Sequence, residues 1–434
     1  MLAFFCFCFS LVLFICFFPY IFSVYMMMLI FPFMFFMNFD GSFLSKNSYL
    51  FLDSYSFSML MLCYMIIILC FLSLDLEFWC NFFFFSFYFL FIFLFLFFFC
   101  CNLFLFFFSF ESSLFPTLFL ILGWGINIER INSGFYLFYY TLFSSMPMML
   151  SMFFFLNVSN TLEYLYLSFS SDMYIYFFFL ISFLVKMPMF LVHSWLPKAH
   201  VEAPVFGSMI LAGILLKMGG YGIFRFLFYF KYFSSLNLVW VYISIWGGIL
   251  SSLICIRQID MKSLVAFSSV SHMSLVIIGL FLMSKISISG CFFLMVSHGF
   301  CSSGLFYLVN LVYTRSGTRS MFLNKGLLTI FPSLSLWWFI FCVTNMGCPP
   351  SLNLIGEIFL IISGISWSFM FFFFMMIVSF FGAVYNLFLY TIVNHGISFS
   401  NSFFFNICLI REYYVIFLHF IPIFFFILKL DMLF

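Results

Sequence analysis

The sequence predicts an all-α, polytopic membrane protein with about fourteen spanning helices, and three observations carry this prediction. Hydrophobic residues form 67% of the 434-residue chain and charged residues only 6%, whereas about a quarter of the residues in a soluble domain are charged. Apolar runs continue for the length of a spanning helix, as in Phe82–Cys100, without the alternation of barrel strands. Backbone groups in lipid must pair within the chain, and unbroken apolar runs meet that demand as helices.

The spans are placed between charged residues, prolines, glycines and asparagine clusters, because these residues mark helix ends and connections. In chain order the predicted spans are Met1–Phe18, Tyr20–Met37, Leu50–Leu74, Phe82–Cys100, Asn102–Gly123, Phe135–Asn157, Met173–Lys198, Pro204–Phe228, Leu236–Ile256, Ser263–Ser284, Ile288–Tyr313, Leu327–Ser363, Ser366–Val393 and Glu412–Leu430. The connections are short, so we expect one transmembrane domain over residues 1–434 and no sizeable domain outside the membrane.

Two of these spans, the seventh and the twelfth, are expected to be broken. Proline removes a helical hydrogen bond and clashes with the preceding turn. Pro188 interrupts the seventh span, and the pair Pro349 and Pro350 interrupts the twelfth. Since lipid-exposed backbone does not tolerate such a loss, both breaks are expected inside the bundle or beside a cavity. Each break lies close to a charge, because Lys186 precedes Pro188 and Glu357 follows Pro350.

Four ionisable residues fall near the middle of predicted spans, and they are the candidate functional residues: Glu111, Lys186, Lys217 and Glu357. Charged groups at membrane depth are rare and usually line a polar path inside a helix bundle. The alternative is an inert role, either a structural ion pair or a lysine that reaches back to the interface. A short carboxylate cannot reach the headgroups, and the four together favour a protein that moves charge.

Lysine suits proton storage at this depth. Burial favours its neutral amine, and a carboxylate nearby favours the ammonium again, so a glutamate that approaches or withdraws can load or release the proton. We expect Glu111 to modulate Lys186 in this way. Lys217 and Glu357 are expected to carry the proton after Lys186.

His272 and His298 lie in serine-rich parts of apolar spans and are candidate relay groups. An imidazole can pass protons at neutral pH, but a hydrogen bond that packs two helices explains either histidine equally well. His193 and His200 flank a turn without a metal-binding pattern, so no metal site is assigned. The remaining histidines, at 395 and 419, are read as interfacial or packing residues.

Other classes of function are disfavoured. A net charge of +2 and the lack of a basic run give no sign of nucleic-acid binding. The 14 cysteines are scattered through apolar runs without the spacing of metal ligands, and they read as small hydrophobic residues. No phosphate loop or dinucleotide fingerprint occurs, so cofactors that power the protein are expected on other chains.

Several motifs together resemble one known family. The matching stretches are Leu184–Pro188, His193–Pro204, Leu216–Gly222, Arg257–Asp260, Lys262–Leu264, Ser268–Met273, Pro349–Glu357 and Arg411–Glu412. Within about Glu111 to Pro422 the chain resembles the chain 4 family of mitochondrial NADH:ubiquinone oxidoreductase, respiratory complex I. The central block, Leu184–Pro204, distinguishes this family from its antiporter-like sister subunits.

The resemblance implies a fourteen-helix, antiporter-like subunit with two inverted five-helix repeats and broken helices seven and twelve. The N-terminal helices would then occupy residues 1–75, the repeats residues 82–228 and 236–393, and the C-terminal helix residues 394–434. It further implies that a central polar axis, linked by the histidines, moves protons from the matrix to the intermembrane space while quinone is reduced elsewhere in the complex. The residues that match this axis are Glu111, Lys186, Lys217, His272, His298 and Glu357.

The resemblance also implies partners and a location. These are the other membrane-arm and accessory subunits, membrane lipids, and a multi-pass position in the mitochondrial inner membrane. FMN, iron–sulfur clusters and ubiquinone are expected on partner subunits, with no redox chemistry on this chain. Two alternatives stay open at this point, a cation/proton antiporter subunit and a membrane scaffold that does not pump.

Charge placement supports one orientation. If the N-terminus faces the intermembrane space, most Lys and Arg residues fall on the matrix side, as the positive-inside tendency requires. That side then holds Arg130, Lys198, Arg257, Lys262, Arg315, Arg319, Lys325 and Arg411. Asp260 and Lys262 are expected to form a surface pair at a helix end.

Overall fold

The computed structural model describes residues 53–74, 81–125, 127–159, 163–164, 173–397, 408–428 and 430. The first two predicted spans, Met1–Phe18 and Tyr20–Met37, lie outside this part of the chain. Within it every regular element is a helix, as the apolar runs predict.

The helices follow one another through short connections. Their bounds are α3 Ser54–Leu72, α4 Asn81–Phe99, α5 Leu103–Ser112, α6 Leu114–Trp124, α7 Arg130–Ser159, α8 Met173–Lys186, η3 Phe190–Val192, α9 Trp195–Glu202, α10 Val205–Ile210, η4 Leu211–Leu215, α11 Leu216–Leu227, η5 Phe228–Phe233, α12 Ser234–Ile256, α13 Met261–Leu282, α14 Lys285–Ser316, α15 Leu327–Ile330, α16 Pro332–Asn345, α17 Leu352–Trp367, α18 Phe369–Asn394 and α19 Ile410–Leu428.

In the described part of the chain, 10 helices are long and apolar enough to cross a membrane, and two shorter apolar helices, α8 and α17, belong to the broken spans. Each predicted span after the second coincides with one or more of these helices. The total of fourteen spans and the assignment of residues 82–228 and 236–393 to inverted repeats stay predictions.

Local sequence explains where several helices begin and end. Asp53 precedes α3, and its side chain accepts from the Ser56 amide at 2.9 Å while the Ser56 hydroxyl accepts from the Asp53 amide at 2.9 Å. This reciprocal cap satisfies two amides that the first turn leaves unpaired. Ser284 caps α14 through the Ser287 amide at 3.0 Å. Gly317 ends the same helix with φ +67°, a left-handed conformation that glycine adopts without a steric penalty.

Both predicted helix breaks are present. Helix α8 ends at Lys186, and α9 begins only at Trp195, on the far side of Pro188. Helix α16 ends at Asn345 and α17 begins at Leu352, so Pro349 and Pro350 lie in the interval.

Two further interruptions were not predicted. The span from Asn102 to Gly123 divides at Ser113, which separates α5 from α6. The span from Pro204 to Phe228 contains the π-helical turn η4, at Leu211–Leu215. Such turns carry one extra residue, and they occur often at functional sites. Here the turn ends two residues before Lys217.

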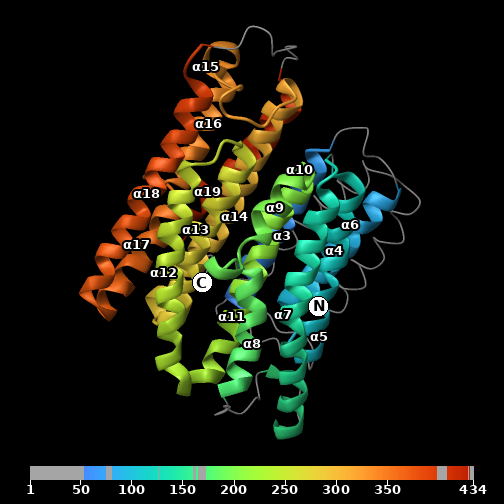
Figure 1. The fold of residues 1–434 in the computed structure, drawn as a ribbon, viewed down its shortest axis with the longest axis vertical. Helices are drawn as coiled ribbons and strands as arrows, with labels where there is room; N and C mark the ends of the chain where they lie inside the picture. The colour runs from blue at the N-terminus through green and yellow to red at the C-terminus, as the bar shows by residue number, and fades with distance from the viewer. Residues whose placement is uncertain are drawn as a thin grey trace.

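The helices form one bundle whose centre contains the broken segments. Figure 1 shows α4 to α7 on one side and α16 to α18 on the other, with α8, α11, α13 and α14 between them. Helix α14 packs against α13, α17 and α10, and α13 packs against α9 and α12. Helix α14 is fully enclosed over its most apolar 18-residue window, as expected of a central helix. Lys186, Lys217, His272 and His298 therefore lie on elements between the two sides, while Glu111 and Glu357 come from the flanking helices α5 and α17.

Candidate functional site

Lys217 lies in the interior with its ammonium beside an imidazole. Its side chain is 0% exposed, so the alternative in which this lysine reaches the membrane surface is wrong. The Nζ atom lies 3.0 Å from Nδ1 of His298, on α14. It also donates to the Ala212 carbonyl, inside the π-helical turn. That turn widens the helix and directs a backbone carbonyl toward a group whose burial would otherwise cost several kcal/mol.

The polar groups continue from His298 to Glu357. The His298 and His272 rings lie 5.2 Å apart between centroids, at an interplanar angle of 44°. Nδ1 of His272 lies 3.8 Å from Oε1 of Glu357, a separation beyond a direct hydrogen bond. The structure thus brings four predicted residues from α11, α14, α13 and α17 into one cluster. We call Lys217, His298, His272 and Glu357 the Lys217–Glu357 run.

Glu357 lies against the break between α16 and α17. Gly347, in that break, has φ +75°, and a Cβ atom there would lie 2.9 Å from Oε2 of Glu357. Glycine at 347 therefore supplies both the left-handed conformation and the space that the carboxylate occupies. Across the same break, the Asn353 amide donates to the Thr344 carbonyl at 2.8 Å, and Ser297 donates to Oδ1 of Asn353. The first bond joins the two half-helices across the interrupted helix, and the second connects α17 to α14.

Glu111 and Lys186 form a second group. The Lys186 side chain is 3% exposed, and its ammonium donates to the Phe110 carbonyl at 2.6 Å while lying 3.2 Å from the Phe110 ring centroid. Glu111 is the next residue on α5, and its charge acts on Lys186 without a direct ion pair. Oε1 of Glu111 is buried and has no hydrogen-bond partner among the residues that the structure describes. The modulation of Lys186 by Glu111 therefore stays a prediction.

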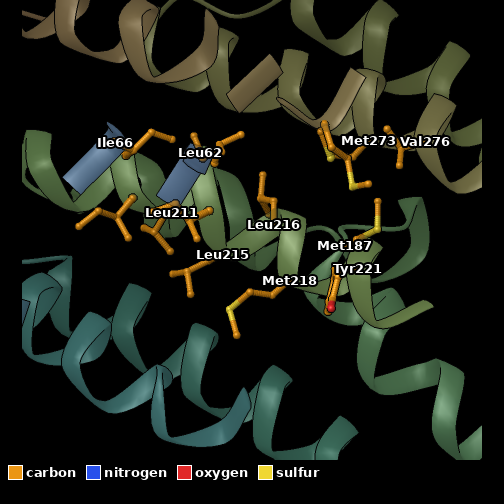
Figure 2. Packing of buried hydrophobic residues seen from close by; sticks show 14 of the residues in the cluster. Leu62, Ile66, Met187, Leu211, Leu215, Leu216, Met218, Tyr221, Met273 and Val276 are labelled. Atoms are coloured by element: carbon orange, nitrogen blue, oxygen red, sulfur yellow. The ribbon is translucent and has the colours of Figure 1, made fainter. Parts of the chain in front are cut away.

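No hydrogen bond or ion pair in the described chain joins these two groups. The residues that follow the two lysines, Met187 and Met218, are both fully buried. A Cβ atom built on Gly219 would lie 2.6 Å from the Met187 side chain, so α11 packs directly on the broken end of α8. Figure 2 labels Met187, Met218 and Tyr221 among the buried residues of this packing. We call this apolar contact between α8 and α11, next to both lysines in the sequence, the apolar seam.

The broken end of α8 is held from the other side of the break. The Trp195 indole donates to the Val185 carbonyl at 3.0 Å, and the Met189 amide donates to the Leu184 carbonyl at 3.2 Å. Trp195 itself is 3% exposed. These bonds satisfy carbonyls at the end of the helix that Pro188 prevents from continuing.

Sequence reasoning missed the polar groups that surround His272. The Tyr385 hydroxyl lies 3.2 Å from Nε2 of His272 and 3.1 Å from the Ser271 hydroxyl. Next to Tyr385 on α18, Asn386 accepts from the Asn345 amide at 2.9 Å. The buried asparagines could have been found as polar residues in apolar spans. Tyr385 gave no such signal, because it is one of 23 tyrosines in the chain.

Lys262 corrects another prediction. It was expected to pair with Asp260 at the surface, but its side chain is 5% exposed and its ammonium donates to the Ala203 carbonyl at 3.1 Å. Asp260 is exposed. Lys262 is the second residue of α13, and its side chain extends toward the end of α9 rather than toward solvent.

The described part of the chain contains no cluster of side chains suited to bind a metal ion. There, no three His, Cys, Asp or Glu side chains gather closely enough to hold a metal ion. The cysteines at positions 63, 70, 100, 101, 255, 291, 301 and 342 are buried and unlinked. What the arrangement offers is a set of groups that can each take up and give up a proton.

Comparison with known proteins gives consistent results. Residues 100–382 match a family model described as NADH:quinone oxidoreductase/Mrp antiporter, TM. A curated relative from Ceratitis capitata, NADH-ubiquinone oxidoreductase chain 4, is 51% identical over 333 residues, which cover 76% of this chain and 74% of the relative.

Two solved structures share the fold at lower identity. Respiratory complex I from Thermus thermophilus with bound NADH contains a chain with a TM-score of 0.85 and 20% identity, covering 93% of this chain and 89% of that one. The Mrp complex from a Dietzia species gives a TM-score of 0.75 at 19% identity, covering 81% and 68%. At these identities the likeness concerns the fold alone.

Proposed function

Because the chain belongs to the NADH:quinone oxidoreductase/Mrp antiporter transmembrane family, we propose that it is the chain 4 subunit of a proton-translocating NADH:ubiquinone oxidoreductase. It moves protons through the membrane arm while ubiquinone is reduced elsewhere in the complex. The observation that carries the proposal is the Lys217–Glu357 run, four titratable side chains in contact or near contact inside an apolar bundle.

The geometry suits stepwise proton transfer. An ammonium can only donate, so His298 accepts at Nδ1 and carries its own proton on Nε2. That proton has His272 as its titratable neighbour, and His272 in turn lies beside Glu357. Each transfer moves one proton from a cationic or neutral donor to the next basic atom.

Glu111 and Lys186 provide a second storage site. While the carboxylate stays near, it stabilises the Lys186 ammonium, and its withdrawal favours release of the proton. Among the described residues, no hydrogen bond or ion pair joins this site to Lys217. Communication between the two groups therefore requires water to enter the seam or the half-helices to shift.

The remaining features of the proposal follow from the family. The partners are other membrane-arm and accessory subunits together with lipids, and the location is the mitochondrial inner membrane. We place FMN, iron–sulfur clusters and ubiquinone on partner subunits and assign this chain no redox step. The relatives that support this reading come from animal species, and their printed name states the NADH-ubiquinone reaction.

A cation/proton antiporter subunit is the competing function, and the Mrp likeness is the observation in its favour. The 51% identity to a chain 4 protein favours the respiratory function over it. Purification separates the two, because the respiratory subunit co-purifies with flavin and iron–sulfur proteins and an antiporter subunit does not.

Glu357→Gln tests the proposal in the whole complex, reconstituted into vesicles with NADH and quinone. The variant keeps the shape of the side chain but cannot ionise, so we expect fewer protons moved per NADH oxidised. Asp260→Asn is the matched control, because Asp260 is an exposed carboxylate at the start of α13 that makes no cap hydrogen bond. A non-pumping scaffold instead predicts normal proton counts in every Glu357→Gln complex that assembles.

A further inference from the structure

Asn353, the second residue of α17, joins both halves of the second broken helix to α14. It is 1% exposed. Its Nδ2 atom donates to the Thr344 carbonyl, in the last turn of α16, at 2.8 Å. Its Oδ1 atom accepts from the Ser297 hydroxyl, on α14. One short side chain thus connects three helices, and we call these two bonds the Asn353 bridge.

The two partners of Asn353 fix the orientation of its amide. A backbone carbonyl only accepts, so the amide nitrogen must face Thr344, and the amide oxygen is left for the Ser297 hydroxyl. Both partners are buried. A carboxylate in this place would put a second acceptor against the Thr344 carbonyl, and an aliphatic side chain would leave buried polar groups without this partner. The position therefore requires one donor and one acceptor on a side chain of this length.

The bonds of Asn353 act on the surroundings of Glu357. Glu357 follows Asn353 by four residues on α17, so the two side chains lie one turn apart on one face of the helix. The Thr344 carbonyl also accepts from the Gly347 amide at 3.2 Å. Gly347 lies against the carboxylate, because a Cβ atom there would be 2.9 Å from Oε2 of Glu357. A single carbonyl thus holds both Asn353 and the turn next to Glu357.

The Ser297 bond connects the same point to α14, which carries His298. Ser297 directly precedes that histidine in the sequence. One turn further along the helix, Sγ of Cys301 lies 3.4 Å from Oγ1 of Thr344, so this face of α14 also contacts the end of α16. The Asn353 bridge therefore sets the position of α17 relative to α16 and also relative to the helix that carries His298.

We propose that Asn353 is a positioning residue that fixes Glu357 relative to the two histidines of the Lys217–Glu357 run. This inference rests on the proposed function and adds a residue that supports it without itself carrying a proton. Oε1 of Glu357 lies 3.8 Å from Nδ1 of His272, a gap that a small displacement of α17 lengthens or closes. When the bonds of Asn353 are lost, this gap is no longer fixed, and proton transfer across it becomes less efficient.

The competing explanation is that Asn353 only caps the open end of α16. The first broken helix shows such a cap, since Trp195, the first residue of α9, donates to the Val185 carbonyl at the end of α8. An indole has one donor and no acceptor, so that cap cannot also bind a third helix through a hydrogen bond. Asn353 differs in its second bond, to Ser297, and in its place one turn before Glu357. A cap alone predicts a loss of stability, whereas the positioning role also predicts a loss of pumping.

The test compares Asn353→Leu with Asn237→Leu in the assembled complex, reconstituted into vesicles with NADH and quinone. Leucine has a similar volume and removes both hydrogen-bonding groups. Asn237, on α12, is the matched control because it is equally buried and joins α8 to the end of α13. It accepts from the Tyr176 hydroxyl at 2.6 Å and donates to Sδ of Met283 at 3.6 Å. We expect both variants to melt at a lower temperature but only Asn353→Leu to move fewer protons per NADH oxidised.

A second comparison separates positioning from general support of the bundle. Asn353→Leu is combined with Glu357→Gln, which removes the carboxylate that the Asn353 bridge positions. If Asn353 acts through Glu357, the double variant moves as many protons per NADH as Glu357→Gln alone. A further loss in the double variant would assign Asn353 to support of the whole bundle and overturn the proposal.

The remaining outcomes also decide the question. A normal proton count in Asn353→Leu rules out positioning here, while a loss in Glu357→Gln measured in parallel leaves the proposed function standing. A normal count in Glu357→Gln overturns the proposed function and the inference with it. An equal loss in Asn353→Leu and Asn237→Leu assigns the effect to stability and overturns the inference alone. If Asn353→Leu does not assemble, Ser297→Ala decides, because it removes the donor to Oδ1 and leaves α17 unchanged: a lower count supports positioning, and a normal count rules it out.

Discussion

The ammonium of Lys217 and Nδ1 of His298 lie 3.0 Å apart although both side chains are 0% exposed. A buried ammonium is tolerated only where specific groups replace its hydration. Here an imidazole and a carbonyl of the π-helical turn at Leu211–Leu215 replace it. Since an imidazole can accept a proton, the proposed path out of Lys217 begins at the same contact that stabilises its charge.

Glu111→Gln is expected to impair proton translocation severely while electron input and assembly persist. The change removes the charge that favours the Lys186 ammonium, so the lysine loses its means of being loaded. Proton counts per NADH oxidised measure the effect. Glu129→Gln is the control, because Glu129 is an exposed carboxylate. Normal pumping by an assembled Glu111→Gln complex would count decisively against a role for this group.

Trp195→Phe is expected to destabilise the break between α8 and α9. The variant removes the indole donor and leaves the buried Val185 carbonyl without that bond, at a cost of about 1–3 kcal/mol. Thermal unfolding of the purified complex measures the change. Trp246→Phe serves as control, since Trp246 is 58% exposed on α12. Equal stability of the two variants would show that the indole bond does not hold the break.

Asp53→Asn is expected to weaken the contact between α3 and α11. Asp53 forms a double contact with Arg225 at 2.6 and 2.7 Å, and loss of the carboxylate from such a largely buried pair costs about 3 kcal/mol. Burial raises the pKa of Asp53, but the charge and hydrogen bonds of Arg225, with those of Ser56, bring it below its ordinary value of 3.8.

The sign of the pH dependence follows from that shift. A carboxylate with a lowered pKa stabilises the folded state fully at neutral pH, and the contribution is lost as the pH falls below the ordinary value toward the lowered one. The difference in melting temperature between the unmodified and Asp53→Asn complexes should therefore be large at neutral pH and shrink under acid conditions. A difference that stays constant into acid would contradict the assignment.

Much of the fold could be predicted because lipid leaves few choices. Apolar runs locate the helices, and Pro188 and Pro350 mark the breaks through a known effect on the backbone. The π-helical turn before Lys217 could not be predicted, since no residue within Leu211–Leu215 excludes an ordinary helix. Its cause lies in the contacts of the folded bundle.

The candidate site was predictable in its residues but not in its connections. Charge at membrane depth is costly enough to identify Glu111, Lys186, Lys217 and Glu357 from sequence alone. The distance between two residues in the fold does not follow from their separation in the sequence. The packing of α8 on α11 at the apolar seam, beside Met187, therefore could not be predicted. Lys262 was misjudged for the same reason, because only the folded α9 supplies the carbonyl that it bonds.

The proton count of a Lys217→Arg complex tests the central claim most directly. Arginine keeps the positive charge but does not release its proton in a protein. Lys285→Arg, at an exposed lysine that begins α14, controls for the substitution itself. If the buried lysine carries protons, the Lys217→Arg complex assembles and oxidises NADH but moves fewer protons per NADH than the Lys285→Arg complex. Equal proton counts in the two complexes would mean that Lys217 supplies only a fixed charge.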